Sequence, residues 1–416
     1  MNHLQLFLPC AAGVEDSLAS EVARITQCAS TAVHKQRGGV ALEAAWRDAQ
    51  LLNLHSRLAQ RVLVRLMLAD YRNEQDLYRA AAAVAWEIWF TPQQSIKVEV
   101  TAQHSPLTSL NFAALKIKDA VCDRFRAKAG GVRPDVNTQW PDIRIFAHLT
   151  TDTLSLYIDT SGEALFKRGW REDKGEAPLK ETLAAAMIAA TGWAQDSTQP
   201  LYDPCCGSGT IAIEAAQIAC RIAPGMLRHF AFEKMLPFQP HVWDAVRAEA
   251  QRAQRPAAGP GQLRIFGSDV AHRMVDFAQR NARRAGVLEV IEFRGGDALQ
   301  RLPPAAQPGV MLLNPPYGER IEVGGVAAPG RREHAQTTEG GDFFVQLAAH
   351  WKKNFPGWTA WLLTPDLKLP GKMRLKETRR VPMWNGPIEC RLFRFDMVQG
   401  SARGAPAGEN AKHPVA

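Results

Sequence analysis

Downstream of residue 178, segments patterned like buried strands alternate with segments patterned like helices. Strands are expected over 200–203, 263–269, 291–293 and 310–313, and helices over 211–222 and 271–285 separate the first three. Strands that alternate with helices in this way predict a parallel sheet. Because the chain then continues into a basic hairpin arm, we expect the sheet to be mostly parallel with an antiparallel hairpin at its C-terminal end.

One polar residue stands at or just beyond the end of each successive strand: Asp203, Asp269, Asp297 and Asn314. Open α/β sheets bind ligands beyond the carboxyl ends of their strands, so these side chains predict a binding cleft. Taken singly, an aspartate at such a place is more often a helix cap or a turn residue. The ordered series favours a nucleoside-like cofactor, with Asp203 near an amino acid part, Asp269 on ribose hydroxyls and Asp297 on an adenine amino group.

The apolar strand 310–313 is stopped by Asn314-Pro315-Pro316-Tyr317. Two consecutive prolines fix φ twice and remove two N–H donors, so the carbonyls of Asn314 and Pro315 are held away from any ladder. An amine with two hydrogens could donate one to the Asn314 side-chain oxygen and one to the Pro315 carbonyl, while its ring stacks on Tyr317. This arrangement suits a flat base with an exocyclic amino group. The alternative is a Pro-Pro turn with Tyr317 as a packing residue.

The segment Gly207-Ser208-Gly209 lies between a predicted strand and a predicted helix, where a ligand can approach the backbone and meet a helix N-terminus. With Ala212 it also fits the glycine fingerprint of dinucleotide-binding dehydrogenases. Such a site needs an acidic residue about 20 residues further on, whereas Asp269 comes much later. No partner for hydride transfer is evident downstream either, so the loop favours the nucleoside-like cofactor.

Residues 1–160 have the pattern of a separate α+β part. The helix expected over 112–128 has an apolar stripe, and most of its basic side chains, including those of Lys116 and Lys118, fall outside that stripe. Such faces are usually only solvated, so solvation and RNA contact are both open for this helix. A second basic run marks the boundary to the sheet domain, and it contains Lys167, Arg168 and Arg171.

The chain of 416 residues has a formal net charge of +8, which modestly favours a polyanionic partner such as nucleic acid. Its longest apolar stretches fall far short of the roughly 20 residues that a membrane span needs. The N-terminus lacks the pattern of a signal peptide. The seven cysteines include no Cys-x-x-Cys motif, which would indicate a metal site. We therefore expect a cytoplasmic protein with reduced thiols, no membrane contact and no metal.

Several motifs resemble those of a known family. The segments 203–210 (DPCCGSGT) and 314–317 (NPPY) resemble the cofactor and catalytic motifs of class I S-adenosylmethionine-dependent methyltransferases that act on exocyclic amines. The segment 115–121 is similar to the hallmark of a THUMP domain, an RNA-binding module. The segments 166–183 and 384–392 resemble signatures of the ribosomal large-subunit guanine-N2 methyltransferases, specifically the N-terminal half of the bifunctional K/L enzymes. Because the chain ends where their second methyltransferase would begin, only the first activity is expected.

The resemblance implies an α/β fold in which a class I, Rossmann-like methyltransferase sheet follows an α+β ferredoxin-like and THUMP module. The expected parts are a ferredoxin-like part (1–52), a THUMP RNA-binding domain (53–160), a methyltransferase domain (161–397) and a disordered tail (398–416). S-adenosylmethionine is the implied cofactor, and Asn314, Pro315 and Tyr317 are the implied catalytic residues. The residues expected to bind the cofactor are Asp203, Cys205, Gly207, Gly209, Thr210, Asp269 and Asp297.

The implied reaction is methyl transfer to the N2 amine of a guanine in 23S rRNA, with the large-subunit precursor as partner. Three alternatives stay open, namely N6-adenine methylation, guanine-N2 methylation of tRNA, and a non-catalytic role in RNA binding or ribosome assembly. A polar, glycine-rich loop is expected over 324–341 beside the site, and a basic arm over 368–380 near the carboxyl edge of the sheet. RNA contacts are expected from Lys116, Lys118, Lys167, Arg168, Arg171, Arg374, Lys376, Arg379 and Arg380.

Overall fold

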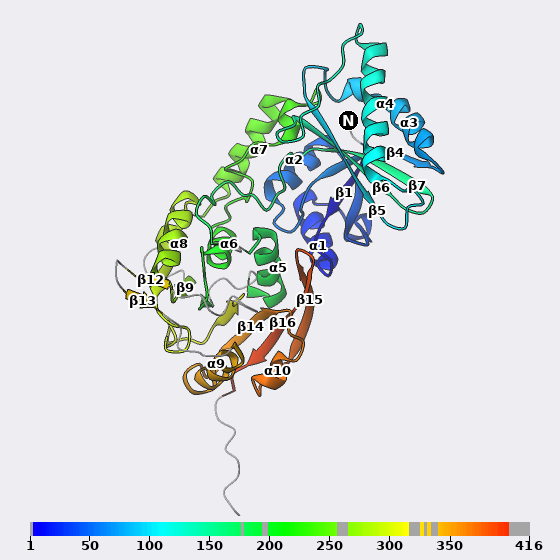
Figure 1. Ribbon diagram of the computed structural model, residues 1–416. Helices are drawn as coiled ribbons and strands as arrows, with labels where there is room; N and C mark the ends of the chain where they lie inside the picture. Colours follow the sequence, from blue (N-terminus) through cyan, green and yellow to red (C-terminus); the bar gives the residue numbers. More distant parts are fainter. Residues whose placement is uncertain are drawn as a thin grey trace, which may run out of the picture.

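The computed structural model describes residues 3–175, 179–193, 199–255, 265–315, 325–327, 331–333 and 340–398. The chain forms two units, each built on a seven-stranded sheet, and the units lie side by side (Figure 1). The N-terminal unit runs to the end of β7 at Asp159, and the C-terminal unit begins with α5 at Glu181. A short two-stranded sheet, β12 (Gly325–Ala327) with β13 (Arg331–Glu333), completes the described strands.

The N-terminal sheet is a single continuous structure. Strand β1 pairs with both β3 and β4, so the first part of this unit shares its sheet with the part that follows. All its strand pairs are antiparallel except β5 with β6. In spatial order the strands are β2 (His34–Gln36), β3 (Gly39–Ala44), β1 (Leu4–Pro9), β4 (Leu63–Asp70), β7 (Thr153–Asp159), β6 (Ile143–Leu149) and β5 (Ile96–Ala102).

Two helices of the N-terminal unit, α3 and α4, begin at side-chain caps, and α4 buries an apolar stripe. The side chain of Asn73 caps α3, and that of Ser109 caps α4 by accepting from the Phe112 amide at 3.2 Å. The apolar stripe predicted for α4 is confirmed, since Ile117 and Phe125 are buried on it. The helices are α1 (Glu15–Thr26), α2 (Trp46–His55), α3 (Glu74–Ala83) and α4 (Leu110–Lys128).

The C-terminal sheet is mostly parallel and ends in an antiparallel hairpin, which confirms the predicted fold class. Strand β11 is buried along its whole length, as an apolar strand covered on both faces should be. In spatial order the strands are β10 (Ile291–Gly295), β9 (Ile265–Asp269), β8 (Leu201–Asp203), β11 (Val310–Leu313), β14 (Thr359–Thr364), β16 (Ile388–Asp396) and β15 (Arg379–Asn385).

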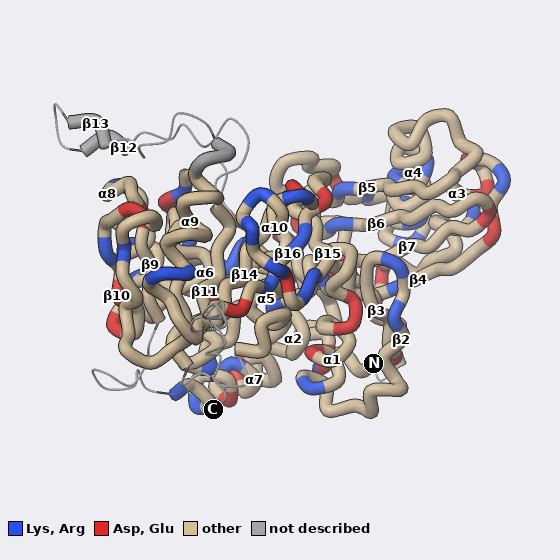
Figure 2. Tube along the Cα trace, turned by 90° about the horizontal axis from the view of Figure 1, so that it is seen from below, with Lys and Arg blue, Asp and Glu red and all other residues tan. Residues whose placement is uncertain are grey.

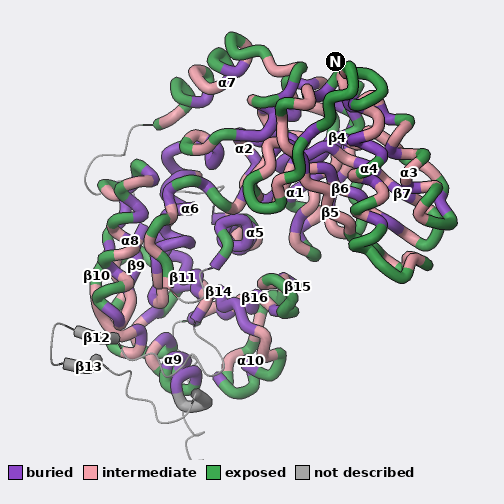
Figure 3. Tube along the Cα trace, turned by 45° about the horizontal axis from the view of Figure 1, so that its top comes forward, coloured by how far each residue is buried: buried purple, intermediate pink, exposed green. Residues whose placement is uncertain are grey.

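Helices pack on this sheet and bury the sides that face it (Figure 3). Helix α6 is buried along nearly its whole length, including Glu214 in the middle of its sequence. None of the helices among the described residues is both long and apolar enough to cross a bilayer. The helices are α5 (Glu181–Thr191), α6 (Thr210–Ala219), α7 (Pro240–Arg252), α8 (His272–Arg284), α9 (Gly340–Asn354) and the short α10 (Leu369–Lys372).

The segment between α6 and α7 packs the C-terminal unit against the N-terminal one. Phe232 is fully buried, and its ring meets Trp46 of α2 edge-on with ring centroids 6.4 Å apart. Its amide also donates to the carbonyl of Thr160 at 3.0 Å. On the other side Phe232 packs against Trp243 of α7 with centroids 4.9 Å apart. This segment therefore forms an aromatic contact between the two units.

A buried ion triad joins the two units. The Glu214 carboxylate, fully buried on α6, accepts from Arg168 Nε and from Arg57 Nη1, each at 3.0 Å. Arg168 also donates to the backbone carbonyl of Arg57 at 2.8 Å. Although burial alone would raise it, the pKa of Glu214 is lowered by the charges of Arg168 and Arg57.

The short strand β2 and the helix α10 were not predicted, because three or four residues carry too little periodic signal. The polar loop predicted over 324–341 lies mostly outside the described residues. Within that range the structure places only β12, β13 and the start of α9. Of the predicted tail, residues 399–416 lie outside the described part as well.

We predict that Glu214→Gln destabilises the protein strongly. The change leaves two guanidinium groups buried beside a neutral amide, and breaking a buried pair of this kind costs about 3–5 kcal/mol. A matched control is Glu163→Gln, because the Glu163–Lys167 pair is exposed and such pairs contribute about 0–1 kcal/mol. Thermal unfolding measured by circular dichroism should give a much lower midpoint for Glu214→Gln only. Equal midpoints would contradict the role of the triad.

Candidate active site

The four polar residues predicted at strand ends lie along one edge of the C-terminal sheet. Asp203 ends β8, Asp269 ends β9, and Asn314 directly follows β11. Asp297 comes two residues after β10. Since these strands are neighbours in the order β10-β9-β8-β11 and all run parallel, their carboxyl ends meet at the same edge. The structure therefore places the four side chains at the edge where open α/β sheets bind ligands.

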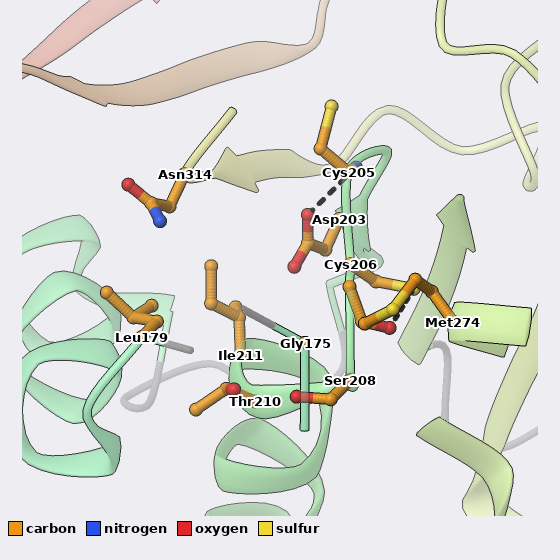
Figure 4. Close-up of a pocket in the computed structure, with 11 residues that line it drawn as sticks. Gly175, Leu179, Asp203, Cys205, Cys206, Ser208, Thr210, Ile211, Met274 and Asn314 are labelled. Carbon is orange, nitrogen blue, oxygen red and sulfur yellow. Dashed lines mark hydrogen bonds between the residues drawn. The ribbon is translucent and has the colours of Figure 1, made fainter. Parts of the chain in front are cut away.

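A cavity opens at this edge, between the glycine loop and the end of β11 (Figure 4). Of the residues predicted to act on a cofactor or substrate, Asp203, Cys205, Gly207, Thr210 and Asn314 line it. Gly209, Asp269 and Asp297 do not line it, and Pro315 does not either. The remaining lining residues are Gly175, Leu179, Cys206, Ser208, Ile211 and Met274.

The glycine loop is shaped by its two glycines and held by Asp269. Gly207 has a φ of 52° and Gly209 one of 86°, both in the left-handed region that favours glycine. A side chain at Gly209 would also collide with helix α8, because a Cβ there would lie 2.9 Å from the Cβ of Ala278. Asp269 accepts from the Gly207 amide at 2.9 Å and from the Ala271 amide at 3.0 Å. Both of its carboxylate oxygens thus support the loop and the start of α8.

Asp203 is a buried carboxyl group that faces the cavity. One of its oxygens accepts from the Cys205 amide at 3.1 Å (Figure 4). Burial, with a further contribution from the charge of Asp269, raises the pKa of Asp203 to about 8. A cationic group entering the cavity would therefore meet a carboxyl group that it can ionise.

The two neighbouring thiols are unsuited to nucleophilic catalysis. Burial raises the pKa of Cys205 and of Cys206, and the carboxylates of Asp203 and Asp269 raise both further. Both groups thus stay protonated near neutral pH, and a thiol is a far weaker nucleophile than a thiolate. Among the described residues no cluster of histidine, cysteine or carboxylate side chains is arranged to hold a metal ion.

Asn314 carries an acceptor that has no partner within the described residues. Its side-chain oxygen is buried, yet it accepts no hydrogen bond there, although buried polar atoms are nearly always paired. Pro315, which follows, is buried. The predicted stacking residue Tyr317 lies outside the described residues. An unpaired oxygen on the wall of a cavity is where a hydrogen-bond donor of a ligand would bind.

Two residues predicted to contact RNA lie inside the protein. Arg168 is buried in the triad with Glu214. The guanidinium of Arg171 donates to Ser208 Oγ at 2.9 Å and to Thr210 Oγ1 at 2.7 Å, behind the glycine loop. These contacts argue against RNA contact by either arginine, because their donors are directed into the protein.

The other predicted RNA residues are on the surface. Lys167 is exposed and paired with Glu163, while Lys116 and Lys118 are half-buried on α4. In the basic arm, Arg374, Lys376, Arg379 and Arg380 are exposed, and Figure 2 shows basic residues along α10, β15 and β16.

The part of the arm that begins β15 lies lower on the sheet than predicted. Arg379 is level with Arg394, which pairs with Trp361 in the middle of β14. The last residues of β15, from Met383, and the hairpin turn after Asn385 extend past the carboxyl end of β14 at Thr364, because that end is level with Pro382. The expectation that the whole arm lies near the carboxyl edge is therefore wrong for Arg379 and Arg380, which lie below that edge.

The sheet order, the glycine loop and the acidic strand ends together define a class I methyltransferase fold. Comparison with known families agrees with this class. Residues 168–394 match the family described as RMKL-like, methyltransferase domain, and the chain belongs to that family. Residues 71–159 match the THUMP domain, and residues 5–63 match the RlmL ferredoxin-like domain.

Individual proteins resemble the chain over most of its length. A ribosomal RNA large subunit methyltransferase K/L of Shewanella sp. (strain W3-18-1) is 35% identical over 96% of this chain and 54% of that protein. The chain thus spans about half the length of the curated relatives it matches. Among solved structures, SMU.472 in complex with SAH has a TM-score of 0.80 at 27% identity, covering 96% of this chain and 100% of that one. A protein described as a predicted N6-adenine-specific DNA methylase, from Listeria monocytogenes str. 4b F2365, has a TM-score of 0.79 at 28% identity, covering 94% of this chain and 96% of that one.

We predict that Asp203→Asn stabilises the protein at alkaline pH. The folded protein keeps a proton on Asp203 up to about pH 8, whereas an unfolded chain loses it near the ordinary pKa of 3.8. The aspartate therefore lowers the stability progressively as pH rises through this window, and the amide removes that loss. Differential scanning fluorimetry should show a higher midpoint for the variant at pH 8.5 and a smaller difference at pH 5. A lower midpoint at pH 8.5 would contradict the burial argument.

Proposed function

We propose that this chain is an S-adenosylmethionine-dependent methyltransferase that modifies the N2 amine of a guanine in 23S rRNA. The observation that carries the proposal is the buried oxygen of Asn314, which has no partner among the described residues and belongs to a residue on the wall of the same cavity as Asp203 and the glycine loop. Two kinds of relative support it, the ribosomal RNA large subunit methyltransferases K/L and SMU.472 with its bound SAH.

The residues at the glycine loop fit this cofactor. The amino acid part of S-adenosylmethionine carries an ammonium group, and the buried carboxyl of Asp203 provides an anionic partner for it. Positive φ angles at Gly207 and Gly209 let a ligand approach the backbone beside the N-terminus of α6. We assign Asp269 and Asp297 to the ribose and adenine ends. When bound, the cofactor supplies an electrophilic methyl group.

In the proposed reaction, the residues of this chain make the amine a better nucleophile. The N2 amine of guanine is a poor nucleophile because its lone pair is delocalised into the ring. If Asn314 Oδ1 and the Pro315 carbonyl each accept one of its hydrogens, the nitrogen becomes more pyramidal and the positive charge that develops on it is stabilised. No strong base is then required. Tyr317 would stack on the base after it leaves its helix.

A second candidate is methylation of the N6 amine of adenine. That amine also has two hydrogens, so the acceptors of Asn314 and Pro315 fit it equally well. The Listeria protein named for this activity resembles the chain at 28% identity. The match of residues 71–159 to the THUMP domain favours RNA as the substrate, and we place the RNA-binding domain there, between a ferredoxin-like part and the methyltransferase domain.

We expect the purified chain to transfer a tritiated methyl group from S-adenosylmethionine to 23S rRNA and to yield N2-methylguanosine on nucleoside analysis. Asn314→Ala should lower the turnover about 100-fold or more, since removing one oriented hydrogen-bonding group from an active site has this effect. Calorimetry should give a cofactor affinity close to that of the unchanged chain. N6-methyladenosine as the product would replace the proposed substrate by the second candidate. Unchanged turnover of the variant would overturn the role of Asn314.

We also propose that the basic arm holds RNA phosphates around the target base. Arg374, Lys376, Arg379 and Arg380 are exposed, although Arg380 is paired with Glu377. Changing all four to glutamine should weaken RNA binding and reduce the slope of log K against log salt by about 0.7–0.9 for each phosphate that the arm no longer neutralises. A control in which the three arginines become lysine keeps the charge and should keep the slope. An unchanged slope in the glutamine variant would exclude the arm from the RNA surface.

A further inference from the structure

The segment that connects the two units also forms part of the cavity wall. We call residues 168–175 the strap. At its start, Arg168 is anchored to Glu214 of α6 and to the backbone of Arg57 in the N-terminal unit. At its end, Gly175 lines the cavity beside Met274 of α8. A Cβ at Gly175 would lie only 3.2 Å from the terminal carbon of Met274, so the strap passes close to α8 there.

Arg171, in the middle of the strap, supports two side chains of the cavity wall. Its guanidinium donates to Ser208 Oγ at 2.9 Å and to Thr210 Oγ1 at 2.7 Å, and both of these residues line the cavity. The same group donates from Nε to Glu181 at 2.7 Å and from Nη2 to the Leu179 carbonyl at 3.1 Å. Four acceptors at fixed positions thus hold the planar guanidinium in one orientation. Arg171 itself does not line the cavity, so it acts through its neighbours.

A second set of contacts fixes the strap to the glycine loop. Asn281 of α8 is fully buried, and its amide group donates to the carbonyl of Asp173 at 2.9 Å and to that of Ser208 at 3.1 Å. A single side chain therefore bridges strap and loop. Arg280 and Arg284, also on α8, donate to the Asp173 carboxylate and hold its pKa below the ordinary value.

We propose that Arg171 is a positioning residue for the methyl donor, and that the strap completes the donor site with residues from outside the glycine loop. This inference rests on the proposed cofactor. A hydroxyl oxygen that accepts a hydrogen bond from a charged donor is held in one position and keeps its own hydrogen free to donate elsewhere. Ser208 and Thr210 would therefore present a constant surface to the amino acid end of the donor, at the start of α6.

The test compares donor affinity with RNA affinity in full-length variants. Arg171→Gln retains hydrogen-bonding groups but cannot reach all four acceptors, and Arg171→Lys keeps only the charge. We expect calorimetry with S-adenosylmethionine to give a Kd raised about tenfold or more in Arg171→Gln, as expected for the loss of charge-assisted hydrogen bonds. Arg171→Lys should fall between this variant and the unchanged chain. The KM for the donor should rise while kcat and the KM for RNA change less than about threefold, because the variant alters only the donor side of the cavity.

A purely structural role of Arg171 would give a different result. Arg171→Gln would then lower the thermal midpoint and weaken the binding of both the donor and the RNA. Glu163→Gln, just upstream of the strap on an exposed pair, is the control and should bind the donor like the unchanged chain. If the Arg171 variants do not fold, Thr210→Val tests the same contact from the loop side and should weaken donor binding in the same way.

The outcomes separate this inference from the proposed function. Equal donor affinity in the unchanged chain, Arg171→Gln and Thr210→Val would overturn the inference. An unchanged chain that binds the donor but methylates no RNA would overturn the proposed function, and the affinity comparison would still decide the role of Arg171. An unchanged chain that binds no S-adenosylmethionine would overturn both.

Discussion

One buried carboxylate determines how the two units meet. Glu214 has no access to solvent, so its charge is tolerable only because Arg57 and Arg168 both reach it. One of these arginines belongs to the N-terminal unit and the other to the connection between the units. The carboxylate itself is on α6, the helix that begins at the glycine loop. The placement of the N-terminal unit and that of the cavity wall are therefore fixed by the same electrostatic requirement.

The parts of this structure that could be predicted from the sequence are those with a local pattern. The strand before Asn314 and the helix after Gly209 can each be recognised from a few residues of sequence. The alternation of such strands and helices is enough to imply a parallel sheet. The location of the polar residues at strand ends could be predicted in the same way, because Asp203 and Asp269 each come last in their strand and therefore lie at its carboxyl end. The sheet order then brings these residues to one edge.

The rest depended on contacts between distant segments. Arg168 and Arg171 stand in a basic stretch with turn residues and so resemble a solvated or RNA-facing loop. Their partners Glu214 and Ser208 are 46 and 37 positions further along the chain, and no local signal links them. Gly175 and Met274 are ordinary residues in the sequence, and only the passage of the connection over α8 brings them to the cavity. Arg379 and Arg380 were placed too high because a turn signal gives the position of the turn and not the register of its strands.

The anchoring of the connection at both ends has a consequence for substrate choice. On the proposed function, a flexible linker would hold an RNA bound at the N-terminal unit at many distances from the cavity, and any base within reach could then be modified. Here the distance between the N-terminal unit and the cavity is fixed, because Arg168 anchors one end of the connection and Asn281 anchors the other. On the proposed function, an RNA bound at the N-terminal unit could present only a base at one fixed distance from that unit, so the shape of the RNA would select the target before any contact with the base itself.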